Sequence, residues 1–152
     1  MALENTITIL RKAPVLGLFE DEALRIIANV ADARRLRAGE VLFRQGDRSD
    51  GGYVVTAGAI AVAREGDEEE AVLLGPGSVI GEVALFVRMQ RPSTATAREP
   101  SAVIRISPTL MKRVLQEYPA AAEPIAALLS RDLEGIAADL DRVERLFAET
   151  TT

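Results

Sequence analysis

Between Leu36 and Ile106 the sequence divides into short runs of β-branched and small apolar residues. These runs read EVLFRQ, YVVTAG, AIAVAR, AVLLG, TATA and AVIRI. Turn residues separate them, such as Gly51-Gly52 and Gly75-Pro76-Gly77. Strands that recur about every ten residues between glycine-rich turns are typical of an antiparallel sandwich or barrel. The pattern therefore predicts an antiparallel, jelly-roll-like β-roll.

Helical periodicity flanks this region on both sides. From residue 5 to residue 31, apolar residues recur at spacings of three and four, and Pro14 and Gly17 divide the segment into a short helix and a longer one. After the strands, Ser107 can cap a helix that begins at Pro108. We therefore expect an α+β fold in a single domain. Its expected parts are N-terminal helices over residues 1–35, the β-roll over 36–107 and C-terminal helices over 108–148 of a domain that spans 1–152.

The last predicted helix carries an apolar repeat in which spacings of three and four alternate. Its members are Ala126, Leu129, Leu133, Ile136, Leu140, Val143 and Phe147. Such a seam is typical of a helix that packs against a partner helix, although a helix that packs on its own domain can also show it. We expect a homodimer through this helix. Gly135 lies inside the seam and weakens a permanent coiled coil.

The chain contains neither His nor Cys. Ser-His-Asp and Cys-His catalysis are therefore excluded, as are disulfides and thiolate metal sites. The net charge of −5 disfavours a broad nucleic-acid surface. No apolar run is long enough to span a membrane, and the N-terminus does not resemble an export signal. We expect a cytoplasmic protein that is not an enzyme, holds no metal, and binds neither nucleic acid nor a membrane.

Several short motifs follow one another in order along the chain. They are Ala38-Gly39-Glu40-Val41-Leu42-Phe43 with Gln45-Gly46-Asp47, then Tyr53-Val54-Val55 with Gly58, then Leu74-Gly75-Pro76-Gly77 leading into Gly81-Glu82-Val83-Ala84-Leu85. In this order, and between these predicted helices, they resemble the cyclic nucleotide-binding domain family. The resemblance covers roughly residues 14 to 147 and implies a regulatory domain whose ligand is cAMP or cGMP.

The stretch GEVALFVRMQRPSTATA, residues 81–97, resembles the phosphate-binding cassette of that family. Gly81 allows the backbone to approach a ligand closely because it has no Cβ. Residues 83–86 can form a helical turn whose first N–H groups lack partners within the turn and favour an anion. The resemblance implies that Glu82 accepts a hydrogen bond from the ribose 2′-hydroxyl and that the amides of Ala84 and Leu85 hold the phosphate. The alternative is that these glycines only form turns and Glu82 is a surface acid.

The second half of this stretch departs from the family's pattern. Family members usually close the cassette with Arg, then Ser or Thr, Ala, and Thr or Ser. Counted back from the tail Thr94-Ala95-Thr96-Ala97, Ser93 stands where the phosphate-pairing arginine is expected. Counted forward from Glu82, Arg91 falls at a usual separation, with Arg88 as the weaker candidate. Both alignments stay open. The candidate ligand-binding residues are therefore Gly81, Glu82, Val83, Ala84, Leu85, Arg91, Ser93, Thr94 and Ala95.

Thr94 bears on the choice of base. Its counterpart in guanosine-preferring family members receives the 2-amino group of guanine, so the resemblance implies the same role here. The alternative is a threonine that only begins a strand.

In the family, the helices after the roll move relative to it, and the last one caps the base. We expect an apolar cap from Leu133, Ile136 or Leu140, although these residues can also serve the dimer seam alone. The sequence thus predicts a cyclic nucleotide-binding regulatory module that signals to an unknown effector protein by moving its C-terminal helices. Since no output motif follows the last helix, we expect a free-standing sensor or part of a longer protein. The alternative, which Ser93 favours, is a degenerate fold that has lost its ligand and acts as a dimeric protein-interaction domain.

Overall fold

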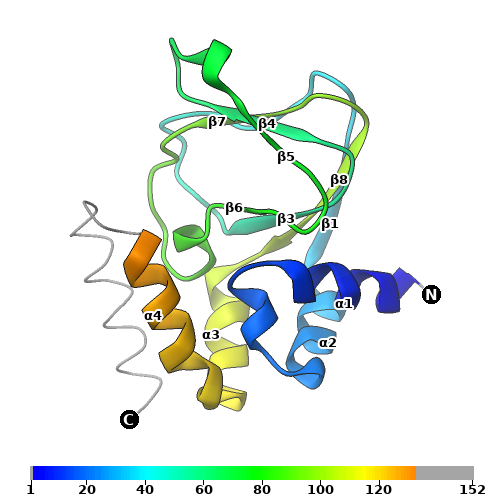
Figure 1. Ribbon diagram of the computed structural model, residues 1–152, viewed down its shortest axis with the longest axis vertical. Helices are drawn as coiled ribbons and strands as arrows, with labels where there is room; N and C mark the ends of the chain where they lie inside the picture. Colours follow the sequence, from blue (N-terminus) through cyan, green and yellow to red (C-terminus); the bar gives the residue numbers. More distant parts are fainter. Residues whose placement is uncertain (1, 133–152) are drawn as a thin grey trace.

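A computed structural model describes residues 2–132 of the chain, and Figure 1 shows a β-roll stacked on a layer of helices. The helices are α1 (Ala2–Lys12), α2 (Asp21–Val30), α3 (Pro108–Glu117) and α4 (Ala122–Asp132), with short 3-10 turns η1 (Leu16–Leu18), η2 (Glu68–Glu70), η3 (Val83–Leu85) and η4 (Pro119–Ala121). The predicted break in the N-terminal helical region, around Pro14 and Gly17, is confirmed. Of the helices in this part of the chain, none is both long and apolar enough to cross a bilayer.

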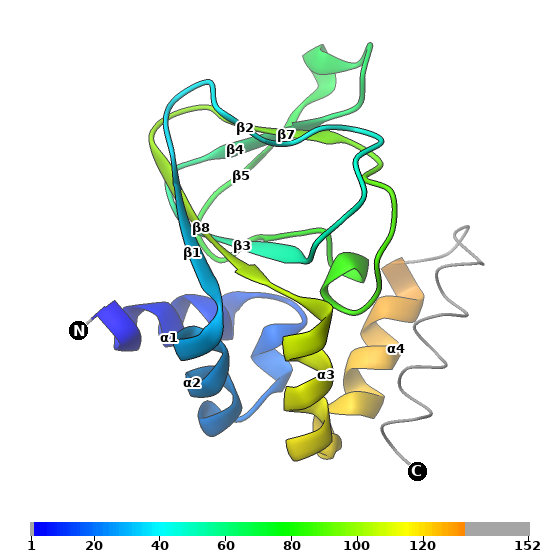
Figure 2. The same cartoon turned by 180° about the vertical axis from the view of Figure 1, so that it is seen from behind.

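Two antiparallel four-stranded sheets form the roll, in the orders β1-β8-β3-β6 and β2-β7-β4-β5. Their strands are β1 (Asp32–Leu36), β2 (Val41–Phe43), β3 (Gly52–Ala57), β4 (Ile60–Ala63), β5 (Val72–Leu74), β6 (Val79–Ile80), β7 (Thr94–Ala97) and β8 (Ser101–Ile106). The α+β class and the antiparallel roll are therefore confirmed. The acidic stretch around η2 forms the tip of the β4–β5 hairpin, and Figure 2 shows it projecting from the roll.

Two of these strands were not predicted. β1 begins at Asp32, before the expected start of the roll at residue 36, and pairs with β8 along its whole length. Every β1 residue except Leu36 is exposed, so no apolar alternation marks the strand. β6 has only two residues, too few to show any periodicity.

Strands β3 and β8 are buried on both faces because they separate two cores. Val54 and Ile104 belong to the core that the sheet shares with the helices. Tyr53, Val55 and Val103 point the other way, into the core between the two sheets. This alternation follows the two-residue period of a strand. The sheet formed by β3 and β8 is therefore in contact with the interior of the roll on one face and the helices on the other.

The predicted apolar seam enters the described part of the chain only at its first two members. Leu129 is fully buried in the core beneath the sheet, and Ala126 packs against that core. For Leu129, packing within the chain therefore replaces the expected contact with a partner helix. The other members, Leu133 to Phe147, lie outside the described residues.

Ser107 caps α3 as predicted, and its hydroxyl Oγ accepts a hydrogen bond from the amide of Leu110 at 3.1 Å. We expect Ser107→Ala to lower the free energy of unfolding by about 1 kcal/mol, since the Leu110 amide loses its partner. Thr109→Ala, at an exposed position two residues further along α3, should change stability little. Urea unfolding of both variants checks this, and equal midpoints would contradict a role for the cap.

Candidate functional site

A cavity of about 420 Å³ opens at one end of the β-roll, beside η3. It is lined by Phe43, Val62, Val79, Ile80, Gly81, Glu82, Val83, Met89, Arg91, Pro92 and Ser93. Most of this lining is apolar, and one cation and one carboxylate project from it. An apolar cavity with a few convergent polar groups is the usual form of a small-molecule site. Five of the nine predicted ligand-binding residues, Gly81, Glu82, Val83, Arg91 and Ser93, line it together.

The predicted helical turn is present as η3, which begins directly after Glu82. Gly81 has a φ of +80°, a conformation that favours glycine, and a Cβ there would lie 2.8 Å from Nη1 of Arg91. The Leu85 amide donates to the carbonyl of Glu82 at 3.3 Å and so helps to close the turn. The side chains of Ala84 and Leu85 are fully buried and do not line the cavity.

The turn is pressed tightly against the sheet at Gly52 of β3. A Cβ at Gly52 would lie 2.6 Å from Cδ2 of Leu85 and 2.8 Å from the carbonyl oxygen of Gly81. Such distances are too short for any real Cβ, so only glycine fits between the cassette and the strand. The position of Gly81 in the site therefore depends on a residue that lies well outside the cassette in sequence.

Arg91 is the buried cation of the site, with a side chain only 3% exposed. Its Nη2 donates to the carbonyl of Gly51 at 2.6 Å and to Oδ1 of Asp50 at 3.4 Å. Its guanidinium carbon lies 4.1 Å from the centre of the Phe43 ring. The sequence predicted Arg91, and the structure shows that Phe43, Asp50 and Gly51 hold it.

Burial lowers the pKa of Arg91, while the nearby Tyr53 and Asp50 act in the opposite direction. Because an arginine starts from a very high pKa, the group stays cationic at neutral pH. Burial also raises the pKa of Tyr53, and the negative charge of Asp50 adds to that shift. The cavity therefore keeps a permanent positive charge in a poorly solvated place, where its attraction for an anion is strong.

The backbone around Arg91 is bonded to the loop that follows β2. The Gly46 amide donates to the Arg91 carbonyl at 2.8 Å, and the Arg91 amide donates to the Asp47 carbonyl at 2.8 Å. The Ser49 amide donates to the Met89 carbonyl at 2.7 Å, and the Met89 amide donates to the Ser49 hydroxyl at 2.9 Å. We call residues 44–51 the clamp loop. It runs antiparallel beside residues 89–91 and fixes that part of the cassette, and nothing in the spacing of the sequence indicated this role.

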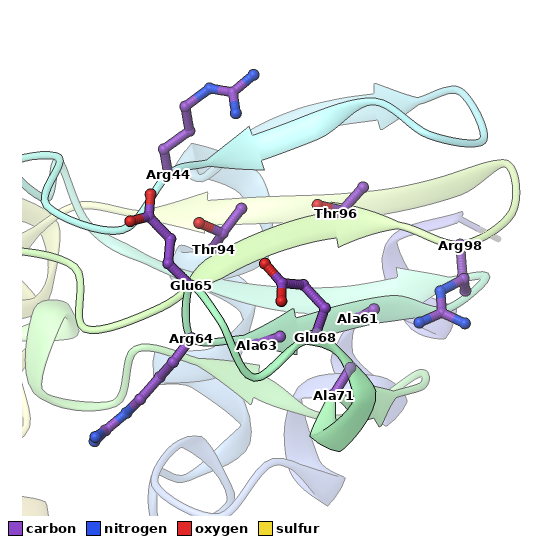
Figure 3. A pocket seen from close by; sticks show the side chains of 10 residues that line it. All are labelled: Arg44, Ala61, Ala63, Arg64, Glu65, Glu68, Ala71, Thr94, Thr96 and Arg98. Carbon is purple, nitrogen blue, oxygen red and sulfur yellow. The ribbon is translucent and has the colours of Figure 1, made fainter.

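The tail of the cassette divides between the two faces of its sheet. Ser93 lines the cavity, whereas Ala95 is fully buried in the core between the sheets. Thr94 lines a different groove of about 380 Å³ on the outer face of the sheet, where Figure 3 shows it beside Thr96. The Thr94 hydroxyl accepts a hydrogen bond from the amide of Gln45 at 2.9 Å. The structure thus places the Ser93 hydroxyl, and not that of Thr94, along the cavity, and the guanine contact at Thr94 stays a prediction. Arg88 is exposed and lines neither space.

Residues 33–118 match the family model of the cyclic nucleotide-binding domain, and the chain therefore belongs to that family. Among solved structures, the chain is similar to a cyclic nucleotide-binding-like protein from Brucella abortus. The two are 38% identical with a TM-score of 0.64, over 73% of this chain and 97% of the other.

Two curated relatives are longer than this chain. The cyclic AMP receptor protein of Thermus thermophilus is 27% identical over 135 residues, which are 87% of this chain and 62% of the relative. The cAMP-dependent protein kinase regulatory subunit of Yarrowia lipolytica is 28% identical over 99 residues, 65% of this chain and 26% of the relative. The chain thus spans less than two thirds of the length of either relative.

Proposed function

We propose that this chain binds cAMP or cGMP in the cavity at the end of the roll and acts as a regulatory module. The observation that carries the proposal is that one buried cation, Arg91, and one carboxylate, Glu82, line the same largely apolar cavity. A cyclic nucleotide presents a singly charged phosphodiester, a ribose hydroxyl and a flat base. The names of two relatives, a cyclic AMP receptor protein and a cAMP-dependent kinase subunit, support this ligand class.

Each part of the ligand meets a suitable group. Arg91 pairs with the phosphate, which corresponds to the alignment counted from Glu82. Glu82 accepts a hydrogen bond from the ribose hydroxyl, and Gly81 lets the sugar-phosphate approach the backbone. Ser93 supplies a hydroxyl at the cavity wall, and the apolar lining, which includes Val62, receives the base.

The signal then passes to the helices through the core beneath the sheet. Val83, Leu85 and Phe86 of the cassette belong to the same core as Met111 of α3 and Ile125 of α4. A ligand shifts this arrangement only if it binds one position of the helices better than another. The proposal also includes a cap over the base from Leu133, Ile136 or Leu140. It further includes a homodimer and a separate effector protein that receives the signal.

The proposal is tested by isothermal titration with cAMP and with cGMP, for which we expect saturation in the micromolar range. Glu82→Ala should weaken binding about tenfold, because a hydrogen bond to a charged group is lost. Glu69→Ala, which removes an exposed acid at the hairpin tip, is the matched control and should bind as the unaltered chain does. Equal affinities for the two variants would remove Glu82 from the site.

The second candidate function is a degenerate domain that binds no nucleotide and works as a dimeric interaction module. Ser93 at the position usual for arginine favours it, as does the ion pair that Arg91 already makes with Asp50. The absence of heat and of any thermal shift with both nucleotides, combined with a dimeric mass by light scattering, would support this function instead.

A further inference from the structure

Arg91 is held by an aromatic ring as well as by hydrogen bonds. Its guanidinium carbon lies 4.1 Å from the centre of the Phe43 ring and 5.6 Å from that of Tyr53. Both Phe43 and Arg91 line the cavity, whereas Tyr53 is not part of its lining. The two rings are 6.0 Å apart and tilted by 32°, so Tyr53 lies beside Phe43 and is the more distant of the two rings from the guanidinium.

The hydrogen bonds alone leave the guanidinium incompletely satisfied. Nη2 has acceptors at Gly51 and Asp50, but Nε is buried and has no hydrogen-bond partner among residues 2–132. A buried charged donor without an acceptor is costly. The negative face of an aromatic ring attracts a cation lying over it, and the attraction grows when water is excluded. The Phe43 ring therefore offsets part of the cost of keeping Arg91 inside the cavity.

Three contacts together define the orientation of the guanidinium. The Phe43 ring covers a face of the group, the Gly51 carbonyl and Asp50 bind its Nη2 edge, and the backbone at Gly81 approaches Nη1. Rotation toward the solvent would lose the ring and both acceptors. A leucine at position 43 would fill similar space but would let the guanidinium turn, because it has no ring face.

We propose that Phe43 is a positioning residue for ligand binding. It fixes the guanidinium of Arg91, and this arginine then serves as the anion anchor of a cassette in which Ser93 stands at the usual arginine position. The proposal rests on the proposed function, since it concerns the same cavity. It gives strand β2, which lies outside the cassette, an indirect role in anion binding.

A double-mutant cycle tests this positioning role. The affinity is measured by isothermal titration with whichever of cAMP and cGMP binds more tightly. In the chain that keeps Arg91, Phe43→Leu should weaken binding about tenfold. In the Arg91→Gln background the same change should have little further effect, because the group that Phe43 positions is gone. Phe43→Tyr keeps the ring and should keep the affinity.

Val62→Ala is the matched control, since Val62 lines the cavity and, like Phe43, is partly buried and packs against the core between the sheets. Its effect should be the same with and without Arg91. The proposal is overturned if Phe43→Leu weakens binding equally in both backgrounds, or if Phe43→Tyr is as damaging as Phe43→Leu.

A second cycle separates this inference from the proposed function. Urea unfolding of the ligand-free chain with Phe43→Leu, Arg91→Gln and both changes measures the contact without any nucleotide. Non-additive changes in the unfolding midpoint are expected for a ring that holds the guanidinium. Additive changes would overturn the inference even if nucleotide binds. If the two changes are non-additive but the chain binds neither nucleotide, the proposed function is refuted, and the positioning role with it. The contact between Phe43 and Arg91 would still be supported in that case.

Discussion

Arg91→Gln is expected to weaken the binding of cAMP and cGMP about a hundredfold. The guanidinium is the buried cation of the cavity, and a charged hydrogen bond contributes about 1.5–3 kcal/mol, where about 1.4 kcal/mol corresponds to tenfold in affinity. The loss should be near the upper end of that range because the Arg91 side chain is almost fully buried. Isothermal titration of the variant against both nucleotides gives the measurement.

The fold should survive this change for two reasons. The backbone bonds between Arg91 and the clamp loop do not involve its side chain. The carboxylate of Asp50, 60% exposed, stays solvated when its partner is removed. Arg88→Gln, on the same loop but exposed, is the matched control and should bind normally. If Arg88→Gln and not Arg91→Gln abolished binding, the anchor assignment would be wrong.

Gly52→Ala is expected to destabilise the chain by about 2–3 kcal/mol, the upper range for adding a methyl group to a packed interior. The new Cβ would collide with the Leu85 side chain and with the backbone oxygen of Gly81. A side chain can turn aside, but the backbone can yield only if the cassette shifts away from the strand. We therefore expect weaker nucleotide binding as well as a lower midpoint in thermal unfolding.

Gly75→Ala provides the control, since no atom lies within 4 Å of a Cβ at Gly75 and its φ is not positive. This change should be neutral or slightly stabilising, because alanine restricts the unfolded chain. A Gly52→Ala variant as stable as Gly75→Ala would show that the cassette is not packed against β3 as described.

The parts of the fold that follow from local patterns could be predicted from the sequence. Short runs of β-branched and small apolar residues between turn residues marked β3 and β8, and Ser107 with Pro108 marked the start of α3. The exposed and charged β1 could not be found in this way, because its stability comes from pairing with β8 rather than from apolar residues of its own. Strand pairing is a long-range property that no short window of sequence contains.

The site was predictable where its residues are adjacent in sequence. Gly81, Glu82 and the helical turn follow from the cassette motif. The direction of Thr94 could not be predicted, because a shift of one residue in register moves a side chain to the other face of a sheet. Phe43 was part of a recognised strand motif, but its ring meets Arg91 only because β2 pairs with β7, the strand that follows Arg91 in sequence.

The ladder between the clamp loop and residues 89–91 also has a consequence for protein engineering. Ligand preference cannot be transferred to a related domain by exchanging residues 81–97 alone, because residues 89–91 take their shape from hydrogen bonds to a segment some forty positions earlier. A functional graft would have to carry both segments, and natural variation in one should be accompanied by compensating variation in the other.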